Sequence, residues 1–231
     1  MDCTAYLWHC DATVHEDRWV NAIDGDLCNL SSSYYERAMH HPISSRWHNN
    51  CVGLVRSLMP GLASARHLDV GCGDGVRIRL AKPAGEIVGV DSDEVMLQAA
   101  KARGITTCHE SVESLHFRDE SFDLVTAIEV FEHIEHPVLA FAEIYRVLKP
   151  RGFFICVTPN DSFLFQALWT LWTNVGMGRF WKSKHVHDYS LWGHTRTGLS
   201  LVDYLRDAGF RPERTASTNL GMVVGVRSIK V

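Results

Sequence analysis

The chain has 231 residues, of which 46% are apolar and 22% are charged, as is typical of a globular protein and not of a disordered one. Its formal net charge is -4, so the chain lacks the basic excess that is typical of nucleic-acid-binding proteins. Seven cysteines without a CxxC pair favour free thiols, and neither a secretory leader nor an apolar run of roughly 18 residues is present, so a cytoplasmic protein is predicted.

The N-terminal part of the chain divides into two stretches. Residues 1–33 lack clear periodicity, and we interpret them as an irregular extension before a single domain over residues 34–231. An apolar face at helical spacing predicts a helix over Tyr34–Met59, which Pro60 and Gly61 end.

Short apolar strands then alternate with helices. The predicted strands are Arg66–Val70, Glu86–Val90, Ile105–Cys108, Phe122–Ala127, Phe153–Val157 and Val223–Val231. The predicted helices are Val76–Ala81, Asp93–Arg103 with Ser92 as its cap and Gly104 at its end, Pro137–Leu148 with Leu139 facing inward, and Leu199–Ala208. This alternation predicts an α/β fold with a parallel sheet covered on both faces, whose ligands bind beyond the carboxyl ends of the strands.

A glycine-rich loop follows the first predicted strand. Gly71, Gly73 and Gly75 remove Cβ atoms where the chain turns sharply and where a ligand can touch the backbone. Asp91 ends the next strand and can accept hydrogen bonds from both hydroxyls of a ribose. A glycine loop by itself is often only a tight turn, but the strand, helix and acid around this one favour a nucleoside site.

The charges near this loop separate two cofactor classes. The spacing is G-x-G-x-G, whereas the dinucleotide fingerprint is G-x-G-x-x-G. Asp69 and Asp74 place negative charge where a pyrophosphate would bind. This pattern favours a ligand that carries an ammonium and a sulfonium, and it leaves a nicotinamide-dependent oxidoreductase as the alternative of another class.

A set of motifs over about residues 50–160 resembles class I S-adenosylmethionine-dependent methyltransferases. Asp69-Val-Gly-Cys-Gly-Asp-Gly75 resembles their first motif, and Val88-Gly-Val-Asp-Ser-Asp-Glu-Val-Met-Leu97 resembles the second. Further similarities lie in Glu110–Phe117, Ser121–Val125 and the turn at Leu148–Gly152. The ubiquinone-biosynthesis O-methyltransferase-like group is the subgroup that the chain resembles.

The resemblance implies a fold and a cofactor. It implies a Rossmann-like, doubly wound sheet that is mostly parallel, with an antiparallel hairpin from residues 210–231. It also implies an S-adenosyl-L-methionine site formed by Asp69, Gly71, Cys72, Gly73, Asp91, Ser92, Met96, Ser111, Val112 and Ile128. Many members carry Asp at the position of Ser111, so a weaker adenine contact is expected here.

Two carboxylates and an imidazole follow the fourth predicted strand. On a helical turn, Glu129, Glu132 and His133 would share one face and could bind a divalent metal. The pattern resembles the metal motif of small-RNA 2′-O-methyltransferases, yet it also occurs in related enzymes without a metal. In that case His133 would orient or deprotonate the substrate. The candidate catalytic residues are therefore Glu129, His133 and, further along the chain, His187.

Large apolar residues are concentrated in the insertion at about residues 161–193, which includes His187. Such a segment could form a lid over an apolar substrate, contact a membrane surface, or pack as a small helical cap. A similar apolar insertion follows the fifth strand in the ubiquinone-biosynthesis enzymes that the chain resembles, whose substrates carry lipid tails. Tyr34, Tyr35 and Arg46 are candidates for closing an N-terminal segment over the cofactor.

The predicted function is O-methylation of an apolar small-molecule or lipid-linked hydroxyl, by a cytoplasmic protein with peripheral membrane contact. The alternatives are metal-assisted 2′-O-methylation of RNA, nicotinamide-dependent oxidation and reduction, and cofactor-dependent regulation without catalysis. The apolar insertion and the net charge argue against a nucleic-acid partner, and the sequence assigns no oligomeric state.

Overall fold

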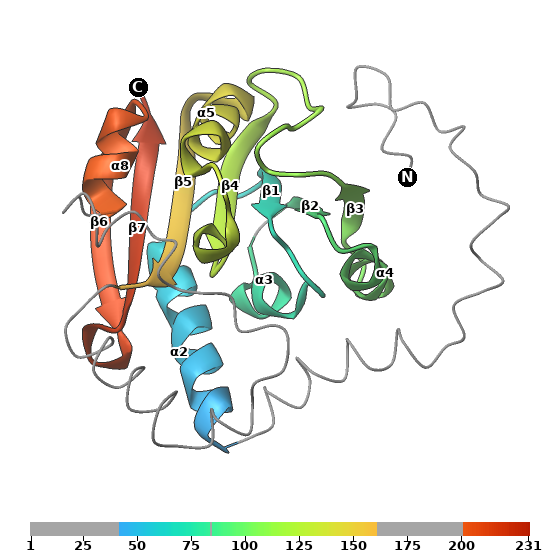
Figure 1. Cartoon of the computed structure of the whole chain (residues 1–231), viewed down its shortest axis with the longest axis vertical. Coiled ribbons are helices and arrows are strands. Elements are labelled where there is room, and N and C mark those ends of the chain that lie inside the picture. The colour runs from blue at the N-terminus through green and yellow to red at the C-terminus, as the bar shows by residue number, and fades with distance from the viewer. Residues whose placement is uncertain (1–41, 84, 161–200) are drawn as a thin grey trace, which may run out of the picture.

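The computed structural model describes residues 42–83, 85–160 and 201–231 (Figure 1). The predicted extension at 1–33, the insertion at 161–193 and His187 lie outside these ranges. A seven-stranded sheet forms the centre, in the order β3-β2-β1-β4-β5-β7-β6. The strands are β1 (Arg66–Val70), β2 (Glu86–Asp91), β3 (Thr106–His109), β4 (Phe122–Ile128), β5 (Leu148–Pro159), β6 (Phe210–Thr218) and β7 (Val223–Lys230).

The strand directions match the predicted Rossmann-like sheet. β3, β2, β1, β4 and β5 pair in parallel, whereas β7 pairs antiparallel with β5 and β6 antiparallel with β7. The hairpin expected at residues 210–231 is therefore confirmed. The strand order reverses between β1 and β4, and in sheets of this kind such a reversal opens a crevice for ligands.

Helices cover both faces of the sheet (Figure 1). One face carries α5 (Pro137–Val147) and α8 (Leu201–Asp207), whose apolar residues share a core with Val70, Val125 and Phe154. The other carries α2 (Pro42–Leu58), α3 (Val76–Ala81) and α4 (Glu94–Ala102), which pack over Leu124, Ile155 and neighbouring residues. Apolar side chains leave the central strands in both directions, which explains why these strands read as continuous apolar runs.

Helix α2 lies unusually close to the sheet at its C-terminal end. A Cβ atom on Gly225 of β7 would lie 2.7 Å from Leu58 Cδ1 and 3.2 Å from Leu54 Cδ2. The missing side chain therefore lets the helix approach the strand directly. This contact helps to fix where the preceding turns of α2, with Trp47 and Cys51, meet the carboxyl end of the sheet.

Two expectations about the helices are wrong, one about a capping residue and one about the direction of a side chain. The cap of α4 is Asp93 and not Ser92, because the Asp93 carboxylate accepts hydrogen bonds from the backbone N–H groups of Val95 and Met96. In α5, Leu139 points to solvent and is 52% exposed, because it lies in the first turn on the outer side of the helix.

The predicted turn at residues 149–152 is part of β5. Leu148 already pairs with Phe122 of β4, and the strand continues to Pro159 with a register shift opposite Asp123. Arg151 adopts a left-handed backbone with φ 64° within this stretch, so the irregularity that the sequence indicated is absorbed as a bulge.

The described cysteines are free and buried: Cys51, Cys72, Cys108 and Cys156. This finding agrees with the free thiols expected from the sequence for these four positions. Within residues 42–83, 85–160 and 201–231, no helix has the length and apolar character needed to cross a membrane.

Candidate cofactor site

A cavity of about 460 Å³ lies at the carboxyl ends of β1, β2 and β4. Its walls contain all the residues that the sequence assigned to the cofactor, namely Asp69, Gly71, Cys72, Gly73, Asp91, Ser92, Met96, Ser111, Val112 and Ile128. They come from separate strands and loops, and the crossover between β1 and β4 brings them together. Their individual roles stay predictions.

The glycine loop owes its shape to left-handed backbone conformations. Gly71, Gly73 and Gly75 have φ values of 61°, 53° and 76°. A Cβ on Gly71 would lie 2.6 Å from Val130, and one on Gly75 would collide with Ile105, whereas one on Gly73 would meet no atom within 4 Å. Gly71 and Gly75 therefore serve the fold, and Gly73 leaves open space beside the cavity.

The carboxylate of Asp91 organises the next part of the wall. Its Oδ2 accepts the backbone N–H of Gly73 at 2.8 Å, and its Oδ1 accepts that of Asp93 at 2.9 Å. Each carboxylate oxygen can accept a further hydrogen bond, so these contacts aim Asp91 without using its capacity for a ribose.

Asp69 ends a buried row of polar groups. It is 3% exposed and accepts a hydrogen bond from the hydroxyl of Thr126, whose oxygen lies 2.8 Å from His67 Nε2. Burial raises the pKa of Asp69 to about 7, although the Thr126 hydrogen bond opposes this shift. Burial also lowers the pKa of His67 to about 3, so that its imidazole is neutral.

The sequence predicted that the charge of Asp74 acts on the ligand, but its carboxylate contacts other groups of the protein. Its Oδ1 accepts the backbone N–H of Val76 at 3.1 Å, and its Oδ2 lies 3.6 Å from the guanidinium of Arg103. Its charge is thus largely balanced by the N-terminus of α3 and by Arg103. The charge argument against a pyrophosphate consequently rests on other acids.

Those acids are numerous. Acidic residues other than Asp74 predominate around the cavity: Asp69, Asp91, Asp93, Glu110, Glu113, Glu129 and Glu135. Arg77 is the only arginine or lysine among the described residues of the lining. Such a lining suits a ligand with positive groups and disfavours a pyrophosphate. The acidic walls and the space at Gly73 therefore fit S-adenosylmethionine better than NAD.

Glu110 is one of several lining acids that the sequence did not assign to the site. Glu110 precedes Ser111 and is buried; burial raises its pKa, and its Oε2 accepts the backbone N–H of His116 at 3.0 Å. Its position directly before Ser111 was a signal that could have identified it. Ser111 itself accepts the N–H of Glu113 at 3.2 Å and pairs with Ser114.

The expectation that Glu129, Glu132 and His133 share one face of a helical turn is wrong. Glu129 has a left-handed backbone with φ 55° and precedes the short 3-10 helix η2 (Phe131–His133). Glu132 is buried against Thr158, and His133 is exposed at the cavity. The backbone turn at Glu129 therefore separates the three side chains.

Glu129 instead forms an ion pair within the protein. Its Oε2 lies 2.6 Å from the guanidinium of Arg77, and its Oε1 accepts the indole N–H of Trp47 at 2.7 Å and lies 3.7 Å from Cys51 Sγ. Burial opposes ionisation, but the Arg77 charge and the Trp47 hydrogen bond hold the pKa of Glu129 below its ordinary value. Arg77 also lies 3.1 Å from His48 Nδ1.

Glu132 is held in the opposite protonation state. Burial, followed by the charge of Glu129, raises the pKa of Glu132 to about 8. A protonated carboxyl group is a poor metal ligand. Within the described ranges, no group of three or more His, Cys, Asp or Glu residues is arranged to hold a metal ion.

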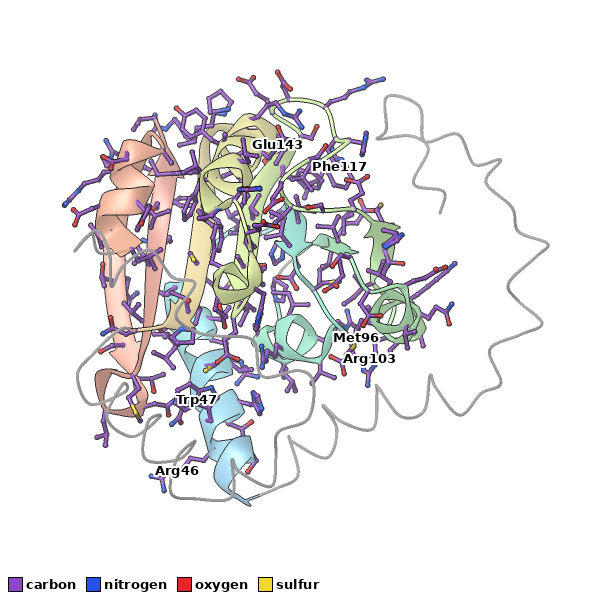
Figure 2. The ribbon with its side chains drawn as sticks, viewed as in Figure 1. Arg46, Trp47, Met96, Arg103, Phe117 and Glu143 are labelled. Carbon is purple, nitrogen blue, oxygen red and sulfur yellow. The ribbon has the colours of Figure 1, made fainter. Side chains whose placement is uncertain are left out.

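Two further expectations concern α2 and the thiols. Arg46 is exposed and projects from the N-terminal part of α2 away from the sheet, whereas the neighbouring Trp47 reaches Glu129 (Figure 2). Burial raises the pKa of the Cys51 and Cys72 thiols, so both stay protonated at neutral pH.

Comparison with known proteins shows which family and which fold the chain resembles. Residues 68–156 match a family described as a methyltransferase domain. An S-adenosylmethionine-dependent methyltransferase from Thermotoga maritima covers 90% of this chain and 100% of its own, with a TM-score of 0.63 and 23% identity. Residues 68–156 thus resemble a methyltransferase domain, and the fold of the chain is the Rossmann-like fold of S-adenosylmethionine-dependent methyltransferases.

The relatives that are similar in sequence carry more specific names than the family. A ubiquinone biosynthesis O-methyltransferase from Ruegeria pomeroyi is 34% identical over 157 residues, which cover 65% of this chain and 61% of the relative. A protein of the same name from Hahella chejuensis is 36% identical over 124 residues, which cover 48% and 50%. The chain thus spans 61% of the length of the first relative and half that of the second.

The fold alone does not decide the reaction. The structure of the [4+2]-cyclase SpnF has a TM-score of 0.60 to this chain at 18% identity, covering 89% of this chain and 94% of its own. A protein named as a cyclase therefore shares the architecture, and the assignment of an activity has to come from the site.

Proposed function

We propose that the chain is an S-adenosylmethionine-dependent O-methyltransferase whose acceptor is the hydroxyl of an apolar small molecule or a lipid-linked compound. The observation that carries the proposal is the acidic cavity at the switch point between β1 and β4, with Asp91 at its edge. This charge favours a ligand with a sulfonium and an ammonium over one with a pyrophosphate.

The residues of the cavity have distinct parts in this proposal. Asp91 accepts the ribose hydroxyls, while Asp69 faces the ammonium and Arg77 faces the carboxylate of the amino-acid part. Met96 and Val112 provide the apolar contact for the adenine. S-Adenosylmethionine, when bound, supplies an already activated methyl group, so the protein contributes mainly positioning and proton removal.

His133 is the better of the two described candidates for the proton acceptor. Its side chain is exposed at the cavity, where an acceptor hydroxyl can reach it. Glu129 fits this role less well, because both of its oxygens are engaged by Arg77, Trp47 and Cys51. We therefore assign Glu129 to the support of the site. His187 lies outside the described residues, and its role stays a prediction.

An apolar acceptor is supported by exposed apolar residues near the site in sequence and by the names of the relatives. Val138 and Leu139, in the first turn of α5, are 69% and 52% exposed and come a few residues after the lining residues Ile134 and Glu135. The relatives are named as O-methyltransferases of ubiquinone biosynthesis. A phenolic hydroxyl on an apolar compound matches both features.

Calorimetric titration tests the cofactor. We expect S-adenosylhomocysteine, and not NADH, to bind the wild-type chain, and Asp91→Ala to weaken this binding at least about tenfold because the charged acceptor is lost. Asp207→Asn on α8 is the matched control, since it removes an exposed acid far along the chain from the cavity. Binding of NADH alone, or of neither ligand, would refute the proposal.

Methyl transfer to candidate acceptors tests the rest. We expect turnover with an alkyl-substituted catechol and none with single-stranded RNA, with or without added Mg²⁺. His133→Ala should lower kcat with little change in the affinity for S-adenosylhomocysteine, because the imidazole faces the acceptor. Turnover of RNA that depends on the metal would favour the 2′-O-methyltransferase alternative instead.

A further inference from the structure

A fully buried row of three polar side chains runs along the edge of the cofactor cavity. His67 and Asp69 lie two residues apart in β1 and thus on the same face of the sheet, and Thr126 is the register partner of Asp69 in β4. His67 and Thr126 are 0% exposed, and only Asp69 reaches the cavity. Burying a histidine in the centre of an apolar sheet costs free energy unless its ring nitrogens form hydrogen bonds.

The hydrogen atoms in this row can be arranged in two ways. In the first, Asp69 is a carboxylate, the Thr126 hydroxyl donates to it, and His67 Nε2–H donates to the Thr126 oxygen. In the second, a protonated Asp69 donates to Thr126, and the Thr126 hydroxyl donates to His67 Nε2. The neutral imidazole then carries its proton on Nδ1.

The other ring nitrogen distinguishes the two arrangements. His67 Nδ1 is buried and has no hydrogen-bond partner. In the first arrangement this atom is an unpaired acceptor, whereas in the second it is an unpaired N–H donor, which buried sites tolerate less well. The lack of a hydrogen-bond partner at Nδ1 therefore favours the first arrangement, in which Asp69 is a hydrogen-bond acceptor only.

We propose that Thr126 and His67 are positioning residues that hold Asp69 as the carboxylate acceptor for the cationic amino group of the cofactor. This inference rests on the proposed function, because it takes a ligand with an amino-acid part as given. Thr126 acts by donating to Asp69, and His67 acts by donating to Thr126 and so orienting its hydroxyl. Neither residue lines the cavity, so each acts on the ligand through Asp69.

The electrostatics around Asp69 make this support necessary. Burial and the nearby carboxylate of Asp91 on β2 raise the pKa of Asp69, while the Thr126 hydrogen bond and the guanidinium of Arg77 on α3 lower it. With these effects combined, the pKa lies at about 7. The loss of the Thr126 donor should raise it further and leave Asp69 protonated at neutral pH.

The test is the pH dependence of ligand binding in Thr126→Val, which has nearly the same shape but lacks the hydroxyl. At neutral pH we expect Thr126→Val to bind S-adenosylhomocysteine about tenfold more weakly than wild type, with affinity recovering as the pH is raised to about 8. Thr126→Ser restores the donor and should bind like wild type. Methylthioadenosine, which lacks the amino-acid part, should bind all three proteins alike at every pH.

Methylthioadenosine also shows whether the variant site is folded. If Thr126→Val does not bind it, His67→Leu is measured in the same way, because this change leaves the contact between Thr126 and Asp69 in place. We expect His67→Leu to shift the pH midpoint of S-adenosylhomocysteine binding upward, by less than Thr126→Val.

The outcomes separate this inference from the function on which it rests. Equal affinity and an equal pH midpoint for wild type and Thr126→Val, with methylthioadenosine bound, would overturn the positioning role and leave the cofactor assignment intact. Failure of wild type to bind S-adenosylhomocysteine at any pH would overturn the cofactor assignment itself.

Discussion

The two walls of the cavity carry similar residues but are built in different ways. The wall after β1 and β2 takes its shape from glycines with positive φ and from hydrogen bonds that Asp91 accepts from Asp93, two residues on, and from Gly73, 18 residues before it. The wall after β4 has a glutamate, Glu129, in the left-handed region, and its side chain is fixed by Trp47, 82 residues away. The first wall is set by local backbone chemistry, and the second by tertiary contacts that stabilise a strained residue.

Among the substitutions, the largest loss of stability is expected from a change of Glu129 in the wall after β4. Glu129→Leu leaves the guanidinium of Arg77 without its ion-pair partner in a mostly buried place, so the free energy of unfolding should fall by about 3 kcal/mol. Denaturant unfolding measures the loss. The double variant Glu129→Leu, Arg77→Met should recover most of it, because no unpaired charge remains; a double variant as unstable as the single one would contradict this account.

A smaller effect separates two glycines within the first wall. Gly75→Ala combines a left-handed alanine with a collision against Ile105 and should destabilise the protein by about 2 kcal/mol. Gly73→Ala has only the backbone strain and should cost about 1 kcal/mol, while weakening S-adenosylhomocysteine binding. Thermal unfolding and calorimetry on both variants test this division, which fails if Gly73→Ala is the less stable protein.

The pH dependence of stability should reveal the buried acid behind the second wall. The folded-state pKa of Glu132 is raised from 4.5 to about 8, so the folded protein retains a proton that the unfolded chain loses. Stability should therefore fall as the pH rises from about 4.5 to about 8, by up to about 1.4 kcal/mol per pH unit.

Urea unfolding across this range compares wild type with Glu132→Gln, which cannot ionise. The variant should show a flatter profile, and Asp69, whose pKa is raised in the same direction, should account for part of the slope that remains. Identical slopes for the two proteins would show that Glu132 ionises normally in the folded state.

The smallest effect concerns the cap of α4 in the first wall. Asp93→Ala removes the acceptor for two backbone N–H groups and should cost about 1 kcal/mol of unfolding free energy. Ser92→Ala, one residue earlier and exposed, should change the stability little. A larger loss of stability for Ser92→Ala than for Asp93→Ala would show that Ser92 caps α4, as the sequence predicted.

Much of the fold could be predicted from local patterns. The bounds of β1 and α3 agree with the prediction, because an apolar run, three glycines and the following helix leave the chain few choices between residues 66 and 81. The residues predicted to bind the cofactor all line one cavity, since they lie at or soon after the carboxyl ends of parallel strands, which meet at one edge of the sheet. The errors at Leu139 and Ser92 are shifts of a residue or two in helix phase and cap, which a pattern does not resolve.

What the sequence determined by itself was therefore the α/β architecture, the glycine-rich loop after β1 and the acid at the end of β2, all of which depend on residues near one another in the chain. Only the tertiary structure decided the partners of Glu129, the balance of Asp74 by Arg103 and the row from His67 through Thr126 to Asp69. The physical reason is that the pKa and direction of a buried polar group depend on desolvation and on neighbours from distant segments. Spacing along the chain does not encode those neighbours.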